Sequence, residues 1–311
     1  MKGWSEIERG RLFEQICAES EKAAAGDAQR ALNLAYLALK FANLARGRPE
    51  WRFSIRSYAW AFVGNARRVA NDLVGADEAF AISRSLWPVG RRKNSQVLDR
   101  SRILGLEASL RRDQRRWPEA LSLLERAQHA TQSENAKVRF LLQKSSILEQ
   151  MGNYHESIKT LCQIRGLETE PRLLFGAHFN LAVNYCHVEK YDSAAELLRG
   201  AQWLARELGN ELDLIRTAWL EGRVLAGLGQ RLEAIPLLER VREEFTHREL
   251  GCDMALVSLE LAVLYLEEGR LHQVRELAQQ IVILFKSQGL YREMLAVFRL
   301  LWEPTAKRRS R

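Results

Sequence analysis

The stretch AWAFVGNARR (residues 59–68) decides the fold, because a Gly-Asn pair lies there inside an apolar run that ends in two arginines. Gly64-Asn65 could form a hairpin turn, belong to a phosphate-binding loop, or place a small residue where a second helix lies close. The flanking residues keep helical spacing, with Tyr58, Phe62 and Asn65 on one face. This spacing predicts a helix whose glycine packs against a neighbouring helix.

A repeated pattern extends outward from this stretch in both directions. Segments such as MGNYHESIKTL (151–161) and LGQRLEAIPLL (228–238) place a turn before an alanine- and leucine-rich stripe. In each of seven copies one residue, usually small, opens the second helix, directly after the turn. Twelve positions upstream, on the first helix, a second residue is also small in six of the seven copies. The first copy departs, with Glu19 upstream of Ala31. The other pairs are Gly64 and Ala76, Ala108 and Ala120, Ser145 and Ser157, Ala182 and Ala194, Gly222 and Ala234, and Ala262 and Val274.

The matched small residues indicate antiparallel helix pairs that approach closely, with apolar residues at i, i+3, i+4 and i+7 between pairs. Gly152, Gly229 and Gly269 are expected to end the first helices of their pairs in a left-handed cap. One pair cannot bury its apolar face alone, so the pairs are expected to stack into a solenoid.

The copies resemble the tetratricopeptide repeat family, and the second copy matches best. That motif has an aromatic residue at position 4, Gly or Ala at 8, Ala at 20 and a large apolar residue at 24, which Trp60, Gly64, Ala76 and Phe80 match. The copies are 37–45 residues apart, whereas the family's repeats are about 34 residues long. In this longer spacing the chain is similar to long-repeat bacterial members of the family, which act as regulatory sensors. The resemblance covers residues 10–285 and implies an all-α, right-handed superhelical solenoid of about seven helix pairs.

We expect one repeat domain over residues 1–303, with a soft break at the basic polar segment VGRRKNSQ (89–96). An apolar stripe that includes Leu295 and Trp302 predicts a C-terminal capping helix over the last open repeat. The remaining residues, 304–311, are expected to form a basic disordered tail.

Composition narrows the class of protein. Six prolines, 19 glycines and 47% hydrophobic residues exclude a disordered or collagen-like chain. The four cysteines are far apart without a CxxC pair, which argues against a zinc site or a disulfide framework and favours a reducing compartment. The polar N-terminus does not resemble a signal peptide, and no run approaches 18 apolar residues. We therefore expect a soluble cytoplasmic protein.

Motifs for catalysis are missing from the sequence. It contains no phosphate-binding loop, no dinucleotide-binding glycine motif, no nucleophile elbow and no HExxH zinc motif. The six histidines are spread over different copies, and no two stand four apart on a helix as a metal pair would. We therefore predict a non-enzymatic protein with no catalytic residues, no cofactor and no metal.

The resemblance also implies a binding surface. In that family the first helices of the pairs form a concave face that holds peptides or protein segments through repeat positions 2, 5, 9 and 12. Arginine recurs at these positions in one half of the expected groove, whereas the fifth and seventh copies give mostly apolar residues such as Phe179 and Leu259. Arginine suits carboxylates and phosphates, so an acidic or carboxylate-bearing segment is the predicted ligand. The carried-over residues are Tyr58, Asn65, Arg68, Arg102, Ser109, Arg112, Arg139, Ser146, Arg216, Trp219 and Arg223.

These observations predict a protein- or peptide-binding scaffold with a regulatory or adaptor role. The same arginines could instead pair with nearby acidic residues and bind nothing. The net charge of +8 leaves nucleic-acid binding as the alternative, although no nucleic-acid-binding motif appears and 39 acidic residues are interleaved with the basic ones. A self-associating module is a third hypothesis, and no membrane partner is expected.

Overall fold

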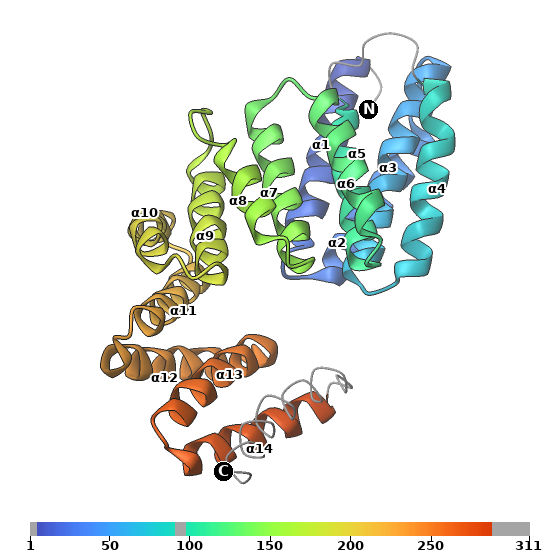
Figure 1. Ribbon diagram of the computed structural model, residues 1–311. Coiled ribbons are helices and arrows are strands. Elements are labelled where there is room, and N and C mark those ends of the chain that lie inside the picture. Colours follow the sequence, from blue (N-terminus) through green and yellow to red (C-terminus); the bar gives the residue numbers. More distant parts are fainter. Residues whose placement is uncertain (1–4, 91–97, 288–311) are drawn as a thin grey trace. The chain divides into compact units, whose positions relative to one another are not determined.

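The computed structural model describes residues 5–90 and 98–287, and within these ranges it contains fourteen α-helices and no strand (Figure 1). Two compact units divide the chain, Met1–Thr169 and Glu170–Arg311. The first unit contains α1 (Glu6–Ala23), α2 (Ala28–Leu44), α3 (Pro49–Val69), α4 (Leu73–Gly90), α5 (Arg100–Asp113), α6 (Trp117–Ala130), α7 (Glu134–Gln150) and α8 (Tyr154–Cys162). The second contains α9 (Pro171–His187), α10 (Tyr191–Leu208), α11 (Glu211–Gly227), α12 (Arg231–His247), α13 (Gly251–Glu267) and α14 (Leu271–Ser287).

The predicted all-α architecture of helix pairs is therefore confirmed for the described ranges. The predicted capping helix and the tail at 304–311 lie outside them, as does nearly all of the break predicted at 89–96. A single repeat domain over 1–303 stays a prediction.

Local sequence signals explain where many helices begin. Ser5, Asp27, Ser133 and Asn210 precede α1, α2, α7 and α11, and each side chain accepts a hydrogen bond from the backbone N–H three residues later. These contacts satisfy donors that have no partner inside the helix. Pro49, the first residue of α3, fits there because its missing N–H would have no helical partner either.

The turns inside the pairs share one backbone feature. In the six pairs from α3–α4 to α13–α14, a residue with positive φ stands two positions before the second helix begins. Glycine adopts this left-handed conformation without steric cost, whereas other residues do not. The predicted glycine caps are confirmed at Gly152, Gly229 and Gly269, with φ of 77°, 79° and 74°. Asn71, Arg115 and Glu189 occupy the same position in the other three turns, with φ of 63°, 58° and 57°.

Gly64 lies inside α3, so it belongs neither to a hairpin nor to a phosphate-binding loop. A Cβ atom at this position would lie 2.8 Å from the ring of Phe80 and 3.3 Å from the carbonyl oxygen of Ala76. Both neighbours belong to α4, the partner helix. The structure thus confirms that Gly64 is a packing residue where two helices approach closely.

The first pair corrects the predicted register. Glu19 is exposed, whereas Ser20 is buried and its hydroxyl donates a hydrogen bond of 2.8 Å to the carbonyl oxygen of Ala31. The small residue opposite Ala31 is therefore eleven positions upstream, not twelve. The departure noted at Glu19 is thus explained, because the turn between α1 and α2 shifts the matched position by one residue, to Ser20.

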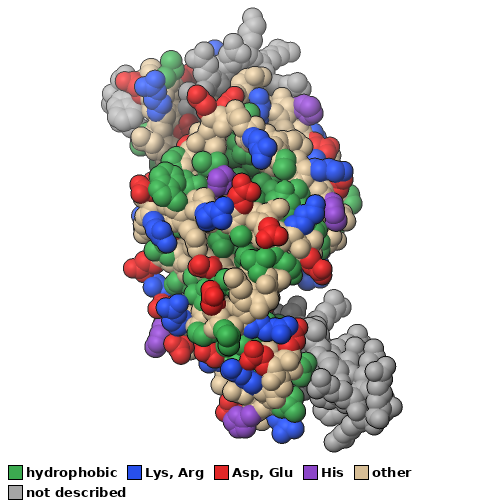
Figure 2. All heavy atoms as spheres, turned by 60° about the vertical axis from the view of Figure 1, so that its left-hand side comes forward, with side chains coloured by type: hydrophobic (Ala, Val, Ile, Leu, Met, Phe, Trp, Pro, Cys, Tyr) green, Lys and Arg blue, Asp and Glu red, His purple; other side chains and the backbone are tan. Residues whose placement is uncertain are grey.

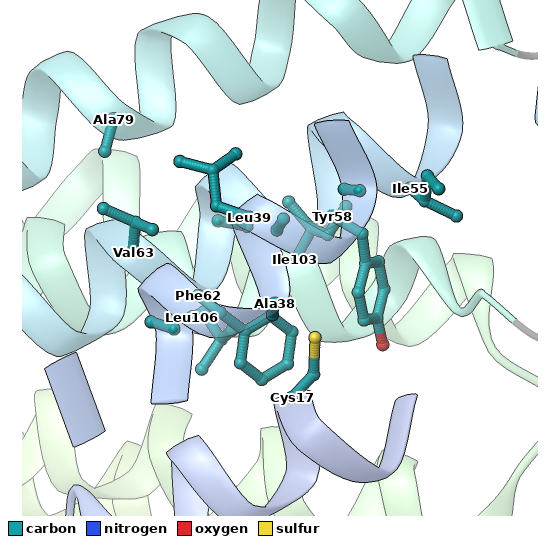
Figure 3. Close-up of a cluster of buried hydrophobic side chains, with 14 of the residues drawn as sticks. Cys17, Ala38, Leu39, Ile55, Tyr58, Phe62, Val63, Ala79, Ile103 and Leu106 are labelled. Carbon is teal, nitrogen blue, oxygen red and sulfur yellow. The ribbon is translucent and has the colours of Figure 1, made fainter. Parts of the chain in front are cut away.

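Helix α3 is the centre of the core of the first unit. Phe13 and Cys17 of α1 meet Tyr58 and Phe62 of α3 there, and all four side chains are fully buried. Figure 3 shows Cys17, Tyr58 and Phe62 in this cluster. The ring of Tyr58 lies 5.2 Å from that of Phe62 and 6.1 Å from that of Phe13. Burial raises the pKa of the Cys17 thiol and of the Tyr58 phenol above their usual values. The middle of α3, residues 57–66, is therefore almost wholly buried, whereas its ends carry arginines that reach solvent.

Candidate functional site

The eleven predicted binding residues all lie on first helices of pairs. Eight belong to the first unit, on α3, α5 and α7, and three belong to α11 of the second unit. Within the first unit, only some of them reach a surface where a ligand could bind.

Tyr58 is a core residue. Its side chain has no exposed area, because Phe13 of α1 covers it and Phe62 packs beside it. Burial disfavours the phenolate and raises the pKa of Tyr58, while the positive charge of Arg102 acts in the opposite direction. The helix α1 therefore occupies the side of α3 where the resemblance placed a ligand.

Arg102 explains why α1 stays in that position. Its guanidinium lies 4.9 Å from the centroid of the Phe62 ring and forms ion pairs with Glu14 at 3.3 Å and Glu21 at 2.6 Å. Both carboxylates belong to α1, so Arg102 joins α5 to α1 across α3. A guanidinium combines stacking on an aromatic face with forked hydrogen bonding, which a lysine cannot do in the same way.

Arg68 and Arg112 converge on one carboxylate, that of Asp113. Arg68 Nη1 lies 2.6 Å from Asp113 Oδ2, and Arg112 Nη2 lies 2.8 Å from Asp113 Oδ1. Asn65 Oδ1 accepts hydrogen bonds from Nε and Nη2 of Arg68, at 3.2 and 3.0 Å. Asn65 is itself buried and fixes the guanidinium of Arg68 from below, so Arg68, Arg112 and Asp113 form one partly exposed cluster, with two positive charges around one negative charge.

Three further predicted residues of the first unit lie on α5 and α7. The Ser109 hydroxyl donates to the carbonyl oxygen of Gly105 in its own helix, at 3.3 Å. Ser146 is half-buried on α7, and Arg139 is exposed on the same helix.

In the second unit, Trp219 and Arg223 hold one carboxylate of α13. The indole Nε1 of Trp219 donates to Glu260 Oε2 at 2.7 Å, and Arg223 Nε lies 3.1 Å from Glu260 Oε1. Burial raises the pKa of Glu260, whereas Arg223 and the indole favour its ionised form. Arg216 lies 4.0 Å from Asp253, also on α13. The predicted residues of this unit therefore form a charge-balanced contact between α11 and α13.

The carboxylates were missed by sequence reasoning, which singled out only the arginines. A signal existed in the second unit, because Arg216 precedes Asp253 by 37 residues and Arg223 precedes Glu260 by the same 37. The equal spacing places the two pairs seven residues apart, about two helical turns, along the same two helices, α11 and α13.

The described residues contain neither a metal-binding cluster nor a membrane-spanning helix. No three His, Cys, Asp or Glu side chains there are arranged to hold a metal ion. Across the same ranges, none of the helices has both the length and the apolar character needed to cross a bilayer.

Solved structures with the same fold were found by comparison. A Rap protein complexed with Competence and Sporulation Factor aligns with a TM-score of 0.64 at 14% identity, covering 89% of this chain and 77% of that chain. The apo form of RapI gives a TM-score of 0.58 at 12% identity, with 89% and 98% covered. A tetratricopeptide repeat protein from Parabacteroides merdae gives 0.53 at 14%, with 92% and 98% covered.

The sequence itself matches no protein-family model, and no curated protein matches it significantly. At these identities, the structural similarity establishes the fold alone. It confirms that the chain has the tetratricopeptide-like helical repeat fold that its sequence predicts.

Proposed function

We propose that this protein is a non-enzymatic repeat scaffold that binds a protein or peptide segment in a regulatory or adaptor role. A binding function is supported by the fold, since a Rap protein of the same fold has been solved in complex with Competence and Sporulation Factor. The exposed sides of the first helices supply the candidate contact surface.

The partner segment is acidic or carboxylate-bearing, and the convergence of Arg68 and Arg112 on Asp113 carries this proposal. The side chains of Arg68, Arg112 and Asp113 are 16%, 28% and 28% exposed, so the cluster reaches solvent while remaining partly desolvated. Two guanidinium groups share one carboxylate, which leaves one positive charge uncompensated within the cluster. A second carboxylate from a partner would complete this arrangement through charge-assisted hydrogen bonds.

The second unit supports this proposal less strongly. Arg216 and Arg223 each have a carboxylate opposite them, Asp253 and Glu260. An incoming acidic group would have to replace these resident carboxylates. We therefore place the main contact with an acidic segment on α3 and α5.

The proposal is tested by selecting ligands from a random dodecamer peptide library with the full-length chain. We expect the selected peptides to be enriched in Asp, Glu or a free C-terminal carboxylate. Their affinity, measured by fluorescence anisotropy, should fall at least tenfold when Arg68, Arg112 and Arg139 are all changed to Gln. The variant Arg199→Gln, at an exposed position of α10, serves as the control. Selection without acidic enrichment, or equal affinity in the triple variant, would exclude this surface.

Nucleic-acid binding, the alternative suggested by the net charge of +8, has less support. On the face shown in Figure 2, Lys and Arg side chains are interspersed with Asp and Glu rather than gathered into one patch. Phosphate binding by a basic surface would give an affinity that falls steeply with salt. Titration with random-sequence duplex at low and high salt distinguishes the two functions, because a scaffold for acidic peptides predicts no binding even at low salt.

A further inference from the structure

A cavity of about 690 Å³ lies between α4, α5 and α6 of the first unit. Its walls include Arg84 and Trp87 of α4 and Arg126 of α6, and α5 forms its floor with Leu104 and Glu107. Sites for small molecules have volumes of about 300–1,000 Å³ and combine apolar walls with a few polar groups. This cavity has the size and the mixed lining of such a site.

The cavity is separate from the cluster of Arg68, Arg112 and Asp113. Its α5 residues include Leu104, Glu107 and Arg111, which follow a spacing of three or four and so share one helical face. Asp113, the carboxylate on which Arg68 and Arg112 converge, stands two positions from Arg111 of that face, which turns it about 200° away around the helix. A ligand in the cavity would therefore contact the opposite side of α5 from the proposed peptide surface.

Arginine dominates the charge around the cavity. Five arginines line it, against the two carboxylates of Glu107 and Glu119. Asp77, which pairs with Arg111 and Arg116 at 2.9 and 3.6 Å, adds one more negative charge. Arginines still outnumber carboxylates among the lining residues, so the site favours an anion.

Two of the lining arginines, Arg111 and Arg116, are already held by protein groups. Arg111 is 5% exposed and binds Asp77, Glu107 at 3.2 Å, and Gln114 at 2.8 Å. Arg116 binds Glu119 through two nitrogens, at 2.6 Å each. These two side chains are fixed, and they contribute a positive potential rather than free donors.

Two other arginines have donors to offer. Arg84 is 47% exposed, and one of its nitrogens pairs with the buried carboxylate of Glu107, which orients the guanidinium at the cavity wall. Arg126 is exposed, and its guanidinium has no ion pair among the described residues. Beside them, Trp87, Ile103 and Leu123 supply apolar contact surface.

We propose that this cavity binds a small organic anion, whose phosphate or carboxylate group pairs with Arg84 and Arg126 and whose apolar part lies against Trp87. A guanidinium fork matches two oxygens of either group, and stacking of Arg and Trp on a flat apolar ligand adds to the affinity. The ligand class is thus defined by one oxyanion next to an apolar, preferably aromatic, group.

Isothermal titration of the full-length chain with four probes tests this assignment. Phenyl phosphate and phenylacetate each combine a ring with an oxyanion, whereas inorganic phosphate lacks the ring and benzyl alcohol lacks the charge. We expect at least one aromatic anion to bind tenfold more tightly than both incomplete probes. Whichever of phenyl phosphate and phenylacetate binds more tightly identifies the preferred oxyanion as phosphate or carboxylate.

Variants locate the binding. Arg126→Gln, which breaks no ion pair among the described residues, should weaken the aromatic anion at least fivefold without lowering the melting temperature, and Trp87→Leu should weaken it as well. Arg199→Gln and the triple variant at Arg68, Arg112 and Arg139 should leave it unchanged, so failure here is distinct from failure of the peptide surface. The assignment is overturned if neither aromatic anion exceeds the incomplete probes, or if Arg126→Gln binds like the wild type.

Discussion

Ser145 Oγ lies 3.0 Å from Ser157 Oγ, and the Ser157 hydroxyl is 3.2 Å from the carbonyl oxygen of Ser145. Both residues are fully buried, and each is the small residue of its helix at the matched positions of α7 and α8. The hydroxyl groups therefore meet only because neither residue holds the helices apart. The same closeness explains the first prediction, at the equivalent position of α3.

Gly64→Leu should lower the melting temperature strongly, because even a Cβ there would lie 2.8 Å from the Phe80 ring. Overpacking at a rigid contact costs about 3 kcal/mol, and Gly64→Ala should cost less. Thermal unfolding followed by circular dichroism measures both. Gly26→Ala is the matched control, because a Cβ at that exposed turn position has nothing within 4 Å. An unchanged melting curve for Gly64→Leu would contradict the packing role.

Glu189→Gly should stabilise the second unit by about 1 kcal/mol. Glu189 has a φ of 57°, a conformation in which its Cβ is strained and glycine is not. Gly152→Ala should have the opposite effect, although a Cβ at Gly152 meets nothing within 4 Å, because φ there is 77°. Urea unfolding measures the change in the free energy of unfolding for each variant. The prediction requires an increase for Glu189→Gly and a decrease for Gly152→Ala.

Asp77→Asn should lower stability at neutral pH but not in acid. The hydrogen bond from Arg111 is the main cause that holds the pKa of Asp77 below its ordinary value of 3.8, with burial acting against it. A carboxylate whose pKa is lower in the folded chain than in the unfolded chain stabilises the fold at any pH above its unfolded-state pKa. This contribution is lost as the pH falls through its folded-state pKa. Because Asp77 is 36% exposed, the effect should not exceed about 1 kcal/mol. Urea unfolding from pH 7 down to pH 3 should show the two proteins converging below about pH 4; a constant gap would contradict it.

Arg102→Met should loosen α1. The substitution removes both ion pairs to α1 while keeping an apolar chain near Phe62. Hydrogen bonds to charged groups contribute about 1.5–3 kcal/mol, so hydrogen exchange should become at least tenfold faster in α1. Arg112→Met is the matched control on α5, because Arg112 pairs with Asp113 of its own helix. Equal exchange rates in α1 for wild type and Arg102→Met would show that packing alone holds this helix.

The sequence predicted what depends on local geometry. Helical spacing and a constant twelve-residue offset placed Gly64 opposite Ala76, because both follow from the fixed rise and turn of a helix. The carboxylates Asp113 and Glu260 and the partners of Arg102 were not predicted, since they depend on how one pair crosses the next. The burial of Tyr58 was missed for the same reason. Its position in the repeat suggested a ligand contact, but α1 covers it.

The matched small positions also bear on how the chain tolerates changes of length. In six pairs the two matched positions are always twelve residues apart, whereas the spacing between consecutive copies varies from 37 to 45 residues. An added or deleted residue inside the twelve would rotate one small residue out of the contact by about 100°. In these six pairs, insertions are therefore better tolerated between one pair and the next than inside a pair, and those junctions are where a fused tag or domain should do the least damage.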